Sequence, residues 1–248
     1  MLFRSNAGEV VIKPTATTSG VRVYTCSVCG ETKAETIPAT GLPSVCPGGP
    51  TCPGYAFRDM PVPADWSHEG LDYCIYRGYV AGTSASTVSP TGVCTRAQLV
   101  SILYRMQGEP TNVKGYELSK LRAPFNDVPR GQWYTDAIWW AKLTDVVAGT
   151  SATTFDPEGE ITREQLAVIL YNYTQQFAPG SIPAAGSLAG FPDAGSVSSW
   201  ARTEMAWAVG NGLISGTGSG GVAYLSPQGS ATRAQVAAIL MRFEQAMA

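Results

Sequence analysis

Residues 125–173 read FNDVPRGQWYTDAIWWAKLTDVVAGTSATTFDPEGEITREQLAVILYNY, and their order of apolar, capping and turn residues predicts the local structure. Apolar side chains in its last part recur at the spacing i, i+3, i+4, i+7 of one buried helix face: Leu166, Ile169, Leu170 and Tyr173. Thr162 and Gln165 precede that face as a capping box, in which each side chain bonds to the other's backbone amide. An earlier helix is expected from Tyr134 to Leu143. The stretch therefore predicts two helices joined by a glycine-containing turn.

The same layout occurs three times along the chain. Each copy has a Phe-x-Asp start, a tryptophan, a glycine-containing turn and a Thr-Arg-x-Gln element before its second helix. The tryptophans and the glycines each recur at a spacing of 67 residues: Trp66, Trp133 and Trp200, and Gly82, Gly149 and Gly216. The first helix of each copy is expected to end at a residue that tolerates the left-handed conformation, namely Gly78, Asp145 or Gly212. An internal repeat of this length organises the fold.

The repeat divides the chain into a Cys-containing β or linker segment, 1–53, and three repeats, 54–118, 119–185 and 186–248. A single two-helix unit buries little apolar surface, so each repeat alone is expected to be marginal. Three units can close on one another and place the apolar stripes of the three second helices in one core. The expected fold is therefore mainly α, with a short irregular Cys-containing segment at the N-terminus.

The three repeats resemble S-layer homology modules, and residues 125–173 resemble them most clearly. The Thr-Arg-x-Gln element is similar to the Thr-Arg-Ala-Glu element of that family in all three copies. The resemblance implies a pseudo-threefold helical trimer within one chain, around a three-helix bundle. It also implies a location on the cell wall of a Gram-positive-type bacterium and non-covalent binding to an anionic secondary cell-wall polysaccharide, often bearing pyruvate ketals. We expect a monomer without cofactors.

One arginine per repeat is the leading candidate for binding that polymer: Arg96, Arg163 and Arg233. Each occupies the first helical position, where a cation is mildly unfavourable because the helix dipole is positive there. A guanidinium beside unpaired helix amides makes an anion site, and the carboxylate of a sugar ketal is a natural occupant. The alternative is that each arginine pairs with the aspartate of a Phe-x-Asp element.

Three further positions per repeat are candidate ligand contacts. Trp66, Trp133 and Trp200 can lie in the core or stack on sugar. Gly82, Gly149 and Gly216 can allow close approach of a ligand or simply form turns, and the turn is the simpler expectation. The Phe-x-Asp aspartates complete the set: Asp59, Asp127 and Asp193. Three extra residues in the loop of the third repeat, and Val88 where the second repeat has Phe155, indicate that the three grooves differ.

Composition and charge exclude several other classes. The 17 basic and 19 acidic residues give a net charge of −2, so the chain offers no basic field for nucleic acid. Because no run of 18 apolar residues occurs, no membrane insertion is expected. The N-terminal residues lack the apolar core of a secretory signal, so an export signal is expected upstream of this sequence.

An enzyme is not expected. The single histidine, His68, lies next to Glu69 in an arrangement that does not suit a catalytic triad, and an exposed position in the first helical turn is expected for it. Residues 156–160, DPEGE, lack the alternating ligand spacing of a calcium loop, so a solvated turn is the better interpretation. No phosphate-binding or dinucleotide-binding motif occurs.

The cysteines leave two questions open. Four of them form a CxxC-x16-C-x5-C pattern, which is half of a zinc-ribbon signature: Cys26, Cys29, Cys46 and Cys52. The alternative function is therefore a generic surface protein-interaction module with a zinc-ribbon-like element, although disulfides fit an exported protein better. Cys74 and Cys94 are expected in the interior of the first repeat, either as a disulfide or as two buried thiols.

Overall fold

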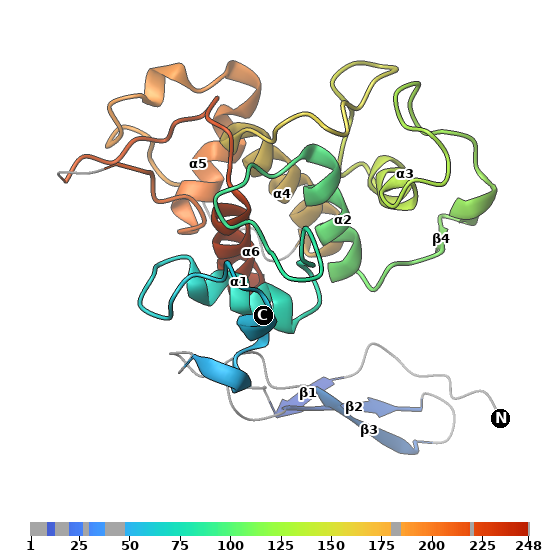
Figure 1. Cartoon of the computed structure of the whole chain (residues 1–248). Helices are drawn as coiled ribbons and strands as arrows, with labels where there is room; N and C mark the ends of the chain where they lie inside the picture. Colours follow the sequence, from blue (N-terminus) through green and yellow to red (C-terminus); the bar gives the residue numbers. More distant parts are fainter. Residues whose placement is uncertain are drawn as a thin grey trace. The chain divides into compact units, whose positions relative to one another are not determined.

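The computed structural model of the chain describes residues 9–12, 20–26, 30–37, 48–179, 185–218 and 221–247. The chain divides into two compact units, Met1–Cys52 and Pro53–Ala248. Figure 1 labels the helices α1 to α6 and the strands β1 to β4. All three repeats lie within the second unit.

The N-terminal unit contains a three-stranded antiparallel sheet with the strand order β1-β2-β3. The strands are β1 (Glu9–Ile12), β2 (Gly20–Thr25) and β3 (Thr32–Ile37), and a short 3-10 turn, η1, covers Gly49–Thr51. The expectation of an irregular segment is wrong for these strands. Valine and threonine are frequent in β2 and β3, and β-branched residues favour the extended backbone of a sheet.

The second unit is mainly helical, as the sequence predicts. Its described residues contain two α-helices per repeat: α1 (His68–Tyr76) and α2 (Arg96–Met106), α3 (Thr135–Leu143) and α4 (Arg163–Phe177), and α5 (Arg202–Gly210) and α6 (Arg233–Met247). The shorter elements are η2 (Pro53–Ala56), β4 (Asn112–Val113), β5 (Tyr116–Glu117), η3 (Leu118–Lys120), η5 (Ala194–Ser196) and η6 (Ser199–Ala201). Gly78, Asp145 and Gly212 follow the first helices with φ of 72°, 59° and 67°, which confirms the predicted helix ends.

The second helix of every repeat begins with the predicted capping box. The Gln98 amide donates to Thr95 Oγ1 at 3.2 Å, while Gln98 Oε1 accepts from the Thr95 amide at 3.2 Å. The Thr162/Gln165 and Thr232/Gln235 pairs form the same two bonds. The apolar stripes behind these caps are buried, so the local signals in the sequence fix where these helices start and which face turns inward.

The helices pair between repeats. The first helix of each repeat packs against the second helix of the repeat before it, so α3 contacts α2 and α5 contacts α4. In the same way α1, from the first repeat, packs against α6, from the third, and the two lie side by side in Figure 1. Glu244 of α6 strengthens this contact by pairing with Arg77 and accepting hydrogen bonds from the hydroxyls of Tyr73 and Tyr79, each at 2.9 Å. The order of contacts among the repeats is therefore cyclic.

A triangle of backbone hydrogen bonds joins the three repeats where their second helices begin. The Cys94 amide donates to the Ala231 carbonyl, the Ala231 amide to the Ile161 carbonyl, and the Ile161 amide to the Cys94 carbonyl, each at 2.9 Å. These residues stand directly before the capping threonines, and all three are fully buried. The hydrogen bonds of this triangle therefore satisfy backbone amides and carbonyls that water cannot reach.

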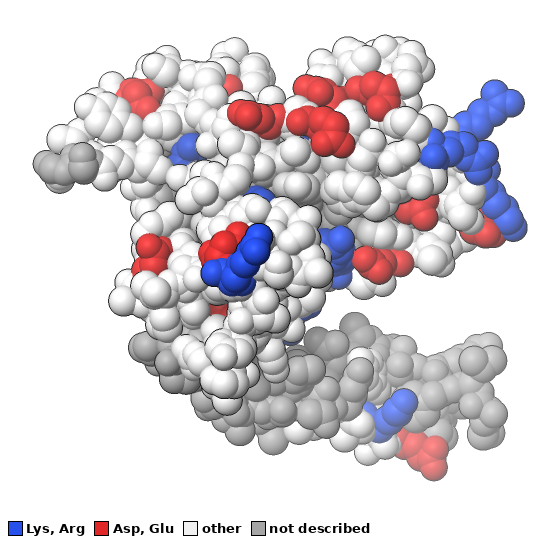
Figure 2. Space-filling model, in the orientation of Figure 1, with Lys and Arg blue, Asp and Glu red and all other residues white. Residues whose placement is uncertain are grey.

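The described residues hold no helix that is both long and apolar enough to cross a bilayer. On the face shown in Figure 2, described Lys and Arg side chains gather near the β4–β5 hairpin and otherwise occur singly. That face therefore carries no continuous basic band of the kind that follows a nucleic-acid backbone.

Candidate functional site

The capping boxes place one arginine at the first position of each second helix, but these arginines are not surface residues. Arg96, Arg163 and Arg233 are only 5 to 8% exposed. The Nε of each donates to a backbone carbonyl of the next repeat in the cycle: Arg96 to Phe155 at 2.8 Å, Arg163 to Leu225 at 2.7 Å and Arg233 to Val88 at 2.8 Å. Each arginine therefore helps to join two repeats, a role that local sequence patterns do not reveal.

The alternative interpretation of these arginines, a direct ion pair with an aspartate, is not found among the described residues. The aspartates instead brace the loops that receive the arginines. Asp127 accepts from the backbone amides of Phe155 and Asp156, and the latter bond measures 2.6 Å. Asp59 and Asp193 hold the first and third loops in the same way. A ligand contact by the aspartates stays a prediction.

Burial and neighbouring groups shift the pKa values of the arginines and of Asp127. Burial lowers the pKa of all three arginines, and nearby carboxylates partly offset this effect, chiefly Asp156 at Arg96 and Asp193 at Arg163. The guanidinium stays protonated because its ordinary pKa is far above neutral. Burial acts to raise the pKa of Asp127, but its bonds from backbone amides outweigh burial, so its pKa lies below the usual value.

The repeated glycines are required by the fold. At Gly149, φ is +91°, and a Cβ would stand 2.6 Å from the Thr154 carbonyl oxygen and 2.8 Å from the ring of Phe125. The phenylalanine of the Phe-x-Asp element crowds the equivalent glycine in the other repeats as well. A side chain at these glycines would therefore collide with the loop backbone and with the phenylalanine ring beneath it. A ligand contact by the glycines stays a prediction.

The repeated tryptophans lie outside the core. Trp66, Trp133 and Trp200 are 64, 58 and 55% exposed, although large aromatic side chains are usually buried to a much greater extent. Three exposed indoles at equivalent positions indicate contact surface more than packing.

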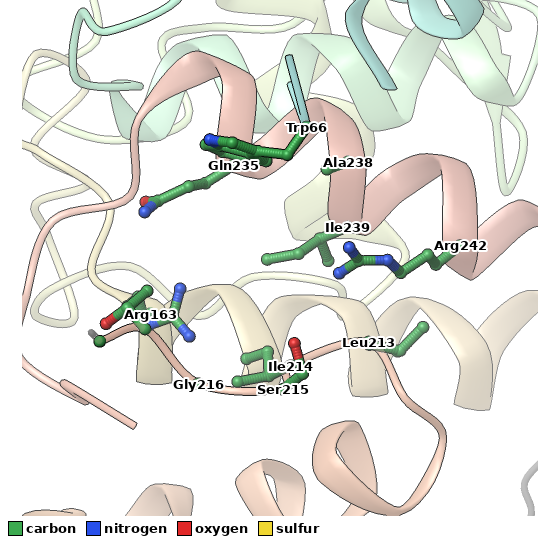
Figure 3. A pocket seen from close by; sticks show the side chains of 12 residues that line it. Trp66, Arg163, Leu213, Ile214, Ser215, Gly216, Gln235, Ala238, Ile239 and Arg242 are labelled. Atoms are coloured by element: carbon green, nitrogen blue, oxygen red, sulfur yellow. The ribbon is translucent and has the colours of Figure 1, made fainter. Parts of the chain in front are cut away.

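Three equivalent pockets bring these residues together, and each pocket draws on all three repeats. We name them after the second helix that lines them. The α6 pocket contains Arg163, Gly216, Gln235, Arg242 and Trp66, the α4 pocket contains Arg96, Gly149, Gln165, Asn172 and Trp200, and the α2 pocket contains Arg233, Gly82, Gln98, Arg105 and Trp133. Their volumes are about 350, 440 and 390 Å³. Figure 3 shows the α6 pocket with Arg163 and Trp66 on different walls.

Sequence reasoning found the arginine, glycine and tryptophan of each pocket but missed the helix residues between them. The capping glutamine is one: Gln165 Oε1 accepts from Arg96 Nη1 at 3.3 Å in addition to its bond within the cap. The other is the residue seven positions after the glutamine, which is Asn172 in the α4 pocket. A spacing of seven residues places both side chains on one helix face, and the sequence alone could have indicated this. The aspartates do not line the pockets.

His68 and residues 156–160 lie in contacts that belong to the fold. His68 is buried, so the expectation of an exposed histidine is wrong, and its Nδ1 lies 2.6 Å from the Pro61 carbonyl oxygen. Residues 156–160 form a turn, as predicted, and the carbonyls of Pro157 and Gly159 accept from the first amides of α2. This turn belongs to the contact between repeats.

The cysteines of the first repeat are two buried thiols without a disulfide. Cys74 Sγ donates to the Ala237 carbonyl at 3.5 Å, and burial raises the pKa of both thiols. In the N-terminal unit Cys26 and Cys52 are buried, whereas Cys29 and Cys46 lie outside the described residues. The choice between zinc and disulfides for these four cysteines stays open.

Comparison with known proteins identifies the family. The S-layer homology domain profile matches residues 57–100, 124–167 and 190–237, which together make up more than half of the chain. The chain belongs to the S-layer homology domain family. The three matches contain the three predicted Thr-Arg-x-Gln elements.

Relatives with S-layer homology regions include proteins of different kinds. The chain is 27% identical over 193 residues to the surface-layer 125 kDa protein of Lysinibacillus sphaericus, covering 78% of this chain and 15% of the relative. It is 30% identical to the amylopullulanase of Thermoanaerobacterium thermosulfurigenes, covering 71% and 9%, and 27% identical to the exoglucanase XynX of Acetivibrio thermocellus, covering 78% and 17%. The chain thus spans less than a fifth of these relatives. The family and its relatives support a general role in cell-wall anchoring at the cell surface.

Proposed function

We propose that the chain anchors a surface protein by binding an acidic, pyruvylated secondary cell-wall polysaccharide in its three pockets. The observation that carries the proposal is the meeting of a buried arginine and an exposed tryptophan in each of three equivalent pockets. The cyclic helix contacts, and the backbone triangle at the starts of the second helices, support a closed pseudo-threefold arrangement of the repeats. In that arrangement every pocket needs all three repeats.

The arginine supplies the charge that recognises the ligand. Since Nε of Arg163 is held by the Leu225 carbonyl, the side chain is fixed and its terminal nitrogens remain for a carboxylate. Within the described part of the chain, the Arg163 side chain forms no other hydrogen bond, and the Arg163 backbone amide donates to the Gly229 carbonyl at 3.0 Å. A fixed guanidinium fork binds a carboxylate with little loss of side-chain freedom. The ketal carboxylate of a pyruvylated sugar has the matching shape and charge.

The tryptophan and the apolar wall supply contact with the sugar ring. In the α6 pocket Ile239 faces the space between α4 and α6, and Trp66 closes it from the first repeat (Figure 3). An indole offers an apolar face and a polar N–H, which suits a sugar with both C–H and hydroxyl surfaces. The pocket therefore combines an anion site with a platform for a ring.

We further infer that this chain has no catalytic role of its own and acts outside the cell. Relatives named as enzymes match it over only 9 to 18% of their own lengths, which supports an attachment module shared among different proteins. Fold and module do not identify the protein that is attached.

Calorimetry with a defined pyruvylated wall fragment tests the proposal. Charge-assisted hydrogen bonds contribute about 1.5–3 kcal/mol each, so removing the ketal carboxylate from the fragment is expected to weaken binding by roughly ten- to a hundredfold. This change in the ligand is the control that leaves the protein fold untouched. An Arg163→Lys variant keeps the charge but loses the fork, and its affinity is expected to fall at one pocket. Equal affinity for fragments with and without the carboxylate would contradict the proposal.

A further inference from the structure

One position distinguishes the three pockets. It lies seven residues after the capping glutamine, on the same face of the second helix, and lines the pocket in every repeat. The residue is Arg105 in the α2 pocket, Asn172 in the α4 pocket and Arg242 in the α6 pocket. Two pockets therefore contain two arginines, and the third contains one.

The α6 pocket has its two arginines on facing helices. Figure 3 shows Arg163 of α4 and Arg242 of α6 directed into the same space, with Ile239 between them. Arg242 is exposed and forms no ion pair within the part of the chain that the structure describes. Both positive charges are therefore available to a ligand.

The α2 pocket holds a weaker version of this pair. Arg105 Nη1 donates to the Tyr79 carbonyl at 3.0 Å, and its Nε lies 3.7 Å from Glu109 Oε1. Burial is the main cause of the lowered pKa of Arg233, and the neighbouring Cys94 acts in the opposite direction. The charge of Arg105 lowers this pKa further, as expected for two cations in one site. Glu109 offsets part of the second charge, although the ion pair is solvent-exposed and contributes little.

The α4 pocket lacks the second charge. Asn172 Nδ2 donates to the Val146 carbonyl at 3.3 Å, so the amide is directed to the turn of its own repeat. The remaining cation, Arg96, feels the charges of Asp156 and Asp127, which act to raise its pKa against the effect of burial. This pocket presents a single, partly compensated positive charge.

We propose that the α6 pocket binds a glycan segment carrying two negative charges, one at Arg163 and one at Arg242, whereas the α4 pocket binds a segment carrying one. The α2 pocket is intermediate. The proposal rests on the proposed function and adds to it which pocket binds a doubly charged glycan segment most tightly. Its physical reason is that the α6 pocket offers a second, exposed guanidinium without an ion-pair partner among the described residues, and a second anion can form charge-assisted bonds with it.

Each pocket has its own tryptophan, so one experiment can follow all three in the intact chain. The protein is labelled with fluorotryptophan, and fluorine NMR follows Trp66 for the α6 pocket, Trp133 for the α2 pocket and Trp200 for the α4 pocket. The probes are a wall-polymer fragment with one ketal carboxylate and a longer fragment with two. With the second fragment, the midpoint at Trp66 is expected at a concentration roughly tenfold lower than at Trp200. With the first fragment, this difference is expected to shrink.

A matched pair of variants separates the second charge from the fold. Arg242→Asn copies the α4 pocket and is expected to raise the Trp66 midpoint for the two-carboxylate fragment roughly tenfold. Asn172→Arg is expected to lower the Trp200 midpoint, a gain that misfolding cannot produce. Simultaneous saturation of Trp66 and Trp200 by that fragment, or an unchanged Trp66 midpoint in Arg242→Asn, would overturn this proposal alone. If a fragment without carboxylates shifts the signals equally well, the proposed function fails with it.

Discussion

Replacing Gly70 by alanine tests the contact that connects the first repeat to the third. Gly70 lies inside α1, where alanine is the better helix former by about 1 kcal/mol. Helix propensity alone therefore predicts a more stable protein. The packing predicts the opposite, because a Cβ at this position would stand 2.6 Å from Cα of Ala238 and 2.7 Å from its nitrogen.

The size of the effect follows from these distances. Carbon atoms pack at about 3.5–4.0 Å, so α1 would have to retreat from α6 by roughly 1 Å. The obstructing atoms belong to the α6 backbone and cannot rotate away, while Leu71 and Cys74 beside them are fully buried. Overpacking typically costs about 1–3 kcal/mol, and an obstacle made of backbone places this site in the upper part of that range. After the propensity gain of about 1 kcal/mol is subtracted, a net loss of up to about 2 kcal/mol is expected. For a body of this size, the melting temperature falls by about 2–4 °C per kcal/mol.

Urea unfolding followed by far-UV circular dichroism measures the change. The control is Ala137→Gly, since Ala137 lies 67 residues later at the equivalent position of α3 and is buried. If propensity dominated, the two substitutions would have opposite effects, whereas packing predicts that both destabilise. A Gly70→Ala protein as stable as the wild type, or more stable, would refute the close approach of α1 to α6.

Two further predictions follow from the buried interior. Deleting residues 183–248 removes α6 and uncovers the apolar faces of Leu103 and Leu170, so the remaining repeats are expected to associate and lose helicity. Light scattering measures the association, and circular dichroism measures the helicity and the melting temperature. A monomeric product with an unchanged melting temperature would indicate a linear array of repeats instead of a closed one. Burial raises the pKa of Cys74 and raises that of Cys94 to about 12, whereas thiols in an unfolded chain titrate near about 8.5. The folded state therefore favours the protonated thiols, and the free energy of unfolding is expected to be constant below about pH 8 and to fall as the pH rises through about 9 to 12. Urea titrations at several pH values measure how steeply the free energy of unfolding falls with pH, and this dependence is expected to be weaker in Cys94→Ala. Rapid alkylation of both thiols in the native protein near neutral pH would contradict their burial.

Much of the architecture follows from local signals in the sequence. The capping boxes, the buried stripes of the second helices and the left-handed residues after the first helices all depend on neighbours within one or two turns. The arginines and tryptophans that line the pockets could also be predicted, because each occurs at the equivalent position of all three repeats. The expected exposure of His68 was wrong, because the residue is buried and its Nδ1 lies against the Pro61 carbonyl oxygen, which its position in the helix does not predict.

Local sequence patterns are enough to predict the number of repeats, the two helices in each and one arginine at the start of each second helix. Contacts between distant parts of the chain set the other features: α1 packs on α6, Arg163 is buried against the Leu225 carbonyl, and a pocket takes its arginine, its helix and its tryptophan from three different repeats. The two groups of features differ in how far apart in the sequence the interacting residues lie. Helix starts and buried faces are set by interactions between residues close in sequence, whereas burial and pocket shape depend on contacts between residues about 60 to 170 positions apart, such as Arg163 with Leu225 and Arg77 with Glu244.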